Sequence, residues 1–132
     1  MTGVKVMRRH MKWIVPAIVV TTFSFLNVAF AGNPAAGAKI FKKKCKTCHR
    51  LSDGTKVGPG LAGVTSRRTN EWLHKWLTNP KAMIKKGDPI AVKLKKKYKK
   101  QMRTYKLMQD EENRENIIAF LKQNDENYEK QK

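Results

Sequence analysis

Apolar residues between positions 33 and 123 recur at spacings of three and four, the pattern typical of amphipathic helices. The first predicted helix begins at Asn33-Pro34, because asparagine is a favoured N-cap and proline is favoured at the first helical position. Its apolar face is formed by Gly37, Ile40, Phe41 and Cys45.

Three further helices are predicted downstream, over about Asn70–Asn79, Ile90–Tyr98 and Asp110–Gln123. Pro80 ends the first of them, and Asp88-Pro89 caps the second. Their apolar positions are Trp72, Leu73, Trp76 and Leu77, then Ile90, Leu94 and Tyr98, and finally Ile117, Phe120 and Leu121.

The remaining segments lack a periodic apolar pattern. Leu51–Arg68 is rich in glycine and is predicted to be a long loop, which in a compact domain usually serves a function. Gln101–Gln109 is predicted to be irregular, and the polar tail after Asn124 is predicted to fray. Because no strand pattern is convincing, the predicted fold class is all-α with about four helices.

The N-terminal segment has the composition of an export signal. Four basic residues and no acidic ones are followed by an apolar run from Trp13 to Phe30, and Ala29-Phe30-Ala31 offers a small-x-small cleavage site. We therefore expect a signal peptide over 1–31 that is cleaved after Ala31, a mature domain over 32–132, and a periplasmic or otherwise exported protein. The alternative is a retained anchor, for which Pro16 and several polar residues make the segment marginal.

The mature segment is strongly basic. Subtracting the four basic residues of the signal from 29 leaves 25 lysines and arginines against 10 acidic residues, a formal charge of +15. Such a field steers association with acidic partners and weakens with salt. Export and the lack of a recognised nucleic-acid motif argue against nucleic acid. We expect a monomer that meets acidic redox proteins, with an anionic membrane surface as the alternative partner.

Cys45-Lys46-Thr47-Cys48-His49 has the spacing of a c-type haem attachment site. On a helix, positions i, i+3 and i+4 share one face, so Cys45, Cys48 and His49 point together at one flat ligand. The two thiols would form thioethers with the haem, and His49 would bind the iron. A thioredoxin-like pair needs a βαβ setting and a zinc site needs further ligands, and neither is visible. The predicted cofactor is one covalent haem c.

In the order of its motifs the mature chain resembles the small soluble class I cytochromes c of mitochondria and bacteria. These motifs are Gly37 with Phe41, the haem motif at 45–49, Val57-Gly58-Pro59-Gly60-Leu61, Arg67, Met102, and Ile117-Ile118-Ala119-Phe120-Leu121-Lys122. The resemblance implies the cytochrome c fold, in which about four helices wrap around one covalently bound haem c.

The resemblance also implies roles for single residues around the haem. Gly37 would lie where the first helix crosses the last, against Phe120. The Pro59 carbonyl would accept a hydrogen bond from Nδ1 of His49 and so fix its tautomer. Arg67 would hold a haem propionate.

For the distal axial position the resemblance implies Met102, although Arg103 stands where the family usually has proline. Thioether ligation suits an electron carrier. If Met102 is instead a surface or core residue, the iron is five-coordinate or is bound by a second histidine, of which the mature chain offers only His74.

The expected function is a periplasmic electron carrier that is not an enzyme and that passes single electrons between larger redox partners. One alternative is a haem enzyme or gas-binding cytochrome with an open or labile distal site, which Arg103 motivates. A second alternative is a fixed subunit of a larger complex, held by the N-terminal segment or by charge.

Overall fold

The computed structural model describes residues 31–131, so the predicted signal peptide lies outside the described residues apart from Ala31. In this part of the chain the regular structure is entirely helical, which confirms the all-α prediction. The elements are α1 (Pro34–Ile40), the π-helical turn η1 (Phe41–Cys45), α2 (Val64–Arg67), α3 (Asn70–Thr78), α4 (Pro80–Lys85), α5 (Pro89–Tyr98), the 3-10 turn η2 (Lys106–Gln109) and α6 (Glu111–Glu129). No helix within residues 31–131 is both long and apolar enough to cross a membrane.

The predicted N-caps are present and explain where the helices begin. The Asn33 side chain accepts hydrogen bonds from two backbone N–H groups of the first turn of α1. Asp88 caps α5 by accepting from the Ala91 N–H at 2.8 Å, and it also accepts from the indole N–H of Trp72. One carboxylate thus starts α5 and ties it to α3.

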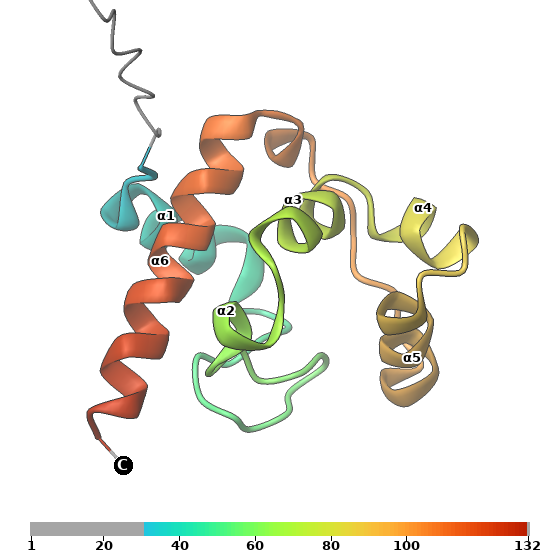
Figure 1. Cartoon of the computed structure of the whole chain (residues 1–132), viewed down its shortest axis with the longest axis horizontal. Helices are drawn as coiled ribbons and strands as arrows, with labels where there is room; N and C mark the ends of the chain where they lie inside the picture. Colours follow the sequence, from blue (N-terminus) through green and yellow to red (C-terminus); the bar gives the residue numbers. More distant parts are fainter. Residues whose placement is uncertain (1–30, 132) are drawn as a thin grey trace, which may run out of the picture.

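The crossing of α1 over α6 organises the fold (Figure 1). Gly37 lies at the crossing, where a Cβ atom would fall 2.0 Å from the Asn116 carbonyl oxygen, so only glycine allows this approach. Beside it, the rings of Phe41 and Phe120 pack with centroids 5.6 Å apart. The Asn33 N–H donates to the Asn116 side chain at 2.6 Å. The predicted place of Gly37 against Phe120 is therefore confirmed.

The core is formed where α1 and η1, α3, η2 and α6 meet. Its buried members are Phe41, Leu73, Leu77, Met108, Ile117, Ile118 and Leu121. The predicted inward positions of α3 and α6 are thus largely correct, although Trp72 and Trp76 are only half-buried and stack on each other at 5.2 Å. Helices α4 and α5 pack mainly against each other and project from this core (Figure 1).

Three boundaries differ from the prediction. The loop Leu51–Arg68 contains the short helix α2, and α4 follows Pro80 where only a helix end was expected. Helix α6 continues to Glu129 rather than fraying after Asn124, because tertiary hydrogen bonds hold its last turns.

Candidate functional site

The three residues of the predicted haem motif follow α1 through the π-helical turn η1. The Lys46 N–H donates to the Phe41 carbonyl five residues earlier, at 2.9 Å. The N–H groups of Cys48 and His49 then both donate to the Cys45 carbonyl. This tight turn brings two half-buried cysteines, which form no disulfide, next to the histidine. Burial, and to a smaller extent repulsion from Cys48, raises the pKa of the Cys45 thiol to about 11.

His49 is held by the loop that follows it. Its Nδ1 donates to the Pro59 carbonyl at 2.9 Å, so the hydrogen bond implied by the resemblance is present. Gly58 packs directly on the ring, because a Cβ there would lie 2.7 Å from Cε1 of His49. Burial lowers the pKa of His49 below its ordinary value of 6.5, while the Pro59 carbonyl acts in the opposite direction. The result is a neutral imidazole whose Nε2 is available as a ligand.

A pocket of about 330 Å³ lies beside His49. Phe41 and Leu51 supply its apolar wall, and the lysines 46 and 56 lie at its edge. An apolar wall with a basic edge suits a flat apolar group that carries acidic substituents.

The segment that contains Met102 lies next to the cysteine turn. Met102 is half-buried and packs against the core. Three residues later, the Tyr105 hydroxyl donates to the Lys44 carbonyl at 3.1 Å, and the Lys44 ammonium lies 5.9 Å from the Tyr105 ring centroid. These contacts hold the segment after Met102 against the residue that precedes Cys45.

Arg67, at the end of α2, is exposed, and its guanidinium donates to the Ala62 carbonyl at the base of the loop. The structure thus places Arg67 on the same loop as Pro59. Its role toward a haem propionate stays a prediction.

Comparison with known proteins decides the family. Residues 34–125 match the family profile described as Cytochrome c. Cytochrome c of Ulva intestinalis is 33% identical over 113 residues, covering 69% of this chain and 89% of that protein. Cytochrome c2 iso-2 of Rhodospirillum centenum is 30% identical over 117 residues, covering 70% and 95%. The solved structure of cytochrome c from Rhodothermus marinus superposes with a TM-score of 0.65 and 32% identity, covering 71% of this chain and 78% of that one. This chain belongs to the cytochrome c family.

As a cytochrome c, the protein is a haem electron carrier with one covalently attached haem c, and its residues fit that group. Two free thiols and a neutral imidazole with one committed nitrogen are the donor set that haem c requires. Among residues 31–131 no cluster of three or more histidine, cysteine or acidic side chains offers a competing metal site.

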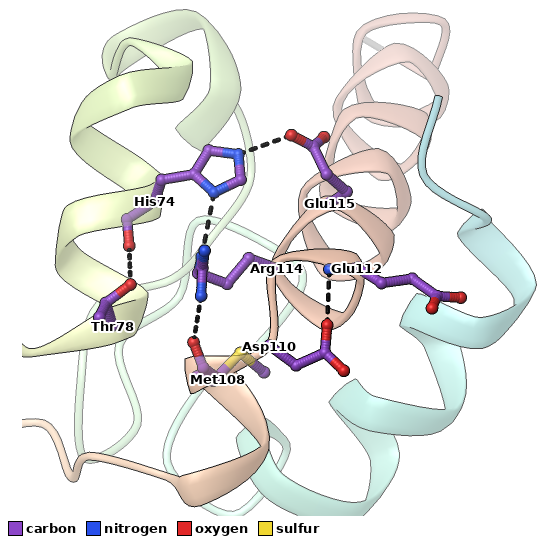
Figure 2. Close-up of polar contacts among 7 residues, drawn as sticks. All are labelled: His74, Thr78, Met108, Asp110, Glu112, Arg114 and Glu115. Carbon is purple, nitrogen blue, oxygen red and sulfur yellow. Dashed lines mark hydrogen bonds and ion pairs between the residues drawn. The ribbon is translucent and has the colours of Figure 1, made fainter. Parts of the chain in front are cut away.

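The second histidine of the mature cytochrome c is engaged on both ring nitrogens (Figure 2). Nδ1 of His74 accepts from the Arg114 Nε–H at 3.1 Å, and Nε2 pairs with a Glu115 carboxylate oxygen at 2.8 Å. Arg114 also donates to the Met108 carbonyl at 2.7 Å, so the cluster ties α3 to α6 and η2. A histidine held in this way serves the fold, which argues against ligation of iron by two histidines.

Sequence reasoning missed the residues that position the site. Tyr105, Asn124 and Asp125 each make a hydrogen bond to a segment more than 50 residues away. No local pattern marks them, because each partner is brought near only by the crossing of α1 and α6.

Proposed function

We propose that this cytochrome c is a periplasmic electron carrier whose haem iron is ligated by His49 and Met102. The observation that carries the proposal is the state of His49. Its Nδ1 is committed to the Pro59 carbonyl, so Nε2 is the nitrogen left to bind a metal. Bound haem supplies a one-electron ferrous–ferric couple, and the chain holds it in place and excludes water from it.

The packing of the other methionines supports Met102 as the distal ligand. Met108 is 1% exposed and belongs to the core, so it is committed to packing. Met83 lies in α4, on the part of the fold that projects from the core. Only Met102 lies in an irregular segment that is tied, through Tyr105, to the turn carrying the cysteines.

Exposed lysines support docking to acidic redox proteins. All of the lysines in two groups are exposed. The first group is Lys42, Lys43, Lys44 and Lys46, and the second is Lys81, Lys85, Lys86, Lys93, Lys95, Lys96, Lys97, Lys99 and Lys100. Charges of this kind speed the encounter with acidic partners in small, short-lived interfaces. An anionic membrane surface is the alternative partner for the same charges.

Export is supported by the composition of residues 1–31 and by the place where packing begins. A Cβ atom on Gly32 would fall 2.2 Å from the Glu115 carbonyl oxygen, so the chain already lies on α6 one residue after the proposed cleavage site. Mass spectrometry of the native protein tests this directly. The expected mass is that of residues 32–132 plus one haem, and a mass that includes residues 1–31 would indicate a retained anchor.

Axial ligation is tested by comparing Met102→Ala with the matched variant Met83→Ala. The oxidised wild type should show the methionine–iron charge-transfer band in the near-infrared, Met102→Ala should lose it, and Met83→Ala should keep it. Loss of the band in Met83→Ala alone would move the assignment to Met83.

Carbon monoxide separates the carrier from a cytochrome with an open distal site. The reduced wild type should not bind carbon monoxide at neutral pH, whereas Met102→Ala should bind it readily. Binding by the wild type would favour the gas-binding alternative that Arg103 motivates. The docking proposal has its own test, because electron transfer to an acidic partner should slow steeply as salt rises.

A further inference from the structure

The loop that carries Pro59 is closed at its base by backbone hydrogen bonds. The Leu61 N–H donates to the Arg50 carbonyl at 2.9 Å, and the Ala62 N–H donates to the Ser52 carbonyl at 3.2 Å. Gly60 permits this closure, since a Cβ there would lie 2.3 Å from the Ser52 carbonyl oxygen. Pro59 therefore lies directly next to the base of the loop, and any movement of the base is passed to its carbonyl.

Two adjacent residues near the end of α6 hold this base from outside. The Asn124 side chain donates to the Leu51 carbonyl at 3.0 Å. The Asp125 carboxylate accepts from the Gly63 N–H at 2.7 Å, from the Thr65 N–H at 2.8 Å and from the Thr65 hydroxyl at 2.6 Å. One turn of α6 thus grips both sides of the loop base.

The burial of Asp125 shows that this contact is specific. Asp125 is 4% exposed, and a buried carboxylate is unfavourable unless its oxygens are hydrogen-bonded. Its three donors all belong to residues 63–65, so the carboxylate stabilises this one position of the loop. On the other side, α6 is fixed by Ile117 and Leu121 in the core. The loop base is therefore referenced to the most rigid part of the protein.

We propose that Asn124 and Asp125 are positioning residues for the proximal histidine. By fixing the loop base on α6, they hold the Pro59 carbonyl 2.9 Å from Nδ1 of His49 and so set the tautomer and orientation of the ring. The inference rests on the proposed ligation of the iron by His49. A firm hydrogen bond to Nδ1 makes the imidazole a stronger donor, which favours ferric iron, so loosening the base should raise the reduction potential.

The test uses the haem-loaded protein and two variants, Asp125→Ala and Asn124→Ala. Nuclear magnetic resonance of the reduced, diamagnetic protein follows solvent exchange of the His49 Nδ1 proton. Loss of the carboxylate contacts should speed this exchange about tenfold, and loss of the single amide contact about threefold. Both variants should raise the reduction potential.

Two control variants separate positioning from charge and from general loss of stability. Glu126→Gln removes a charge from an exposed neighbour of Asp125, and it should change the potential less than the neutral substitution Asn124→Ala does. Asn116→Ala removes a buried amide on the same helix that holds α1 rather than the loop, and it should leave the exchange rate near that of the wild type.

Unchanged exchange in both Asn124→Ala and Asp125→Ala would overturn the inference, and so would equal acceleration in Asn116→Ala. If Asp125→Ala does not take up haem, Asp125→Asn replaces it, because it keeps the shape of the side chain and should show an intermediate acceleration. A wild-type spectrum without iron-bound His49 would overturn the proposed ligation itself. That result is distinct from normal ligation with variants that do not respond.

Discussion

Replacing Gly58 by alanine would place a methyl group against the ring of His49. The added Cβ would lie 2.7 Å from Cε1, 3.2 Å from Nδ1 and 3.3 Å from Nε2. Gly58 is not among the glycines with positive φ, so its backbone accepts alanine and the ring is the only obstacle. The ring cannot turn away freely, because Nδ1 is bonded to the Pro59 carbonyl and Nε2 is proposed to bind iron.

The size of the effect follows from this overlap. Non-bonded carbon atoms pack at about 3.5–4.0 Å, so the ring or the loop must move by about 0.8 Å. Overpacking of this kind destabilises a protein by about 1–3 kcal/mol, whereas the loss of glycine entropy in the unfolded chain returns about 0.4–1 kcal/mol. We expect a net loss of about 1–2 kcal/mol, and each kcal/mol lowers the melting temperature of a domain of this size by about 4–8 °C.

Gly54→Ala is the matched control in the same loop. Its added Cβ would meet nothing closer than the Ser52 hydroxyl oxygen at 3.5 Å, so the entropy effect should act alone and stabilise by about 0.4–1 kcal/mol. Denaturant unfolding of the two haem-loaded variants measures the difference. If Gly58→Ala proves as stable as Gly54→Ala, the loop does not pack on the ring as described.

Two further predictions concern helix packing and pH. Gly37→Ala should destabilise by about 1–3 kcal/mol, because its Cβ would overlap the Asn116 carbonyl oxygen at 2.0 Å and outweigh a gain in helix propensity of about 1 kcal/mol. Ala35→Gly, at an exposed position of α1, calibrates that propensity in the same denaturation assay, and a stabilised Gly37→Ala would contradict the crossing. Because burial lowers the pKa of His49 below 6.5, the unfolded chain binds a proton that the folded protein excludes. The free energy of unfolding should therefore fall as pH drops through about 6.5, and iron ligation acts in the same direction. Denaturation midpoints that stay level or rise as the pH is lowered through this range would contradict it.

The parts of the fold that could be predicted are those with local causes. Asn33 and Asp88 cap their helices through contacts within three residues, so the sequence alone reveals them. Helix α4 was missed because Pro80 was interpreted only as a helix end. In the structure Pro80 also starts the next helix, which Asn79 caps by accepting from the Ala82 N–H at 2.9 Å. The end of α6 was misplaced because Asp125 is held by residues about 60 positions away.

The site divides in the same way. Cys45, Cys48 and His49 are marked by their spacing, since one turn of chain brings them together. The bond from His49 to Pro59 spans ten residues of irregular loop, so only the resemblance to a family implied it. The positioning residues Asn124 and Asp125 lie in a polar tail, where composition alone favours fraying.

The π-helical turn explains how one short helix serves both the core and the haem motif. Phe41 is 6% exposed and packs on Phe120, so it must face α6. In an uninterrupted α-helix, Cys45 would follow four residues later on that same face, as the apolar pattern predicted. The extra residue of the turn rotates everything after it by about 100°, so Phe41 can stay on α6 while the cysteines face elsewhere. Such widening weakens the helical hydrogen-bond ladder, and the Tyr105 hydroxyl supplies a donor to the Lys44 carbonyl at 3.1 Å. The segment proposed to hold the distal ligand therefore also stabilises the turn that presents the haem thiols.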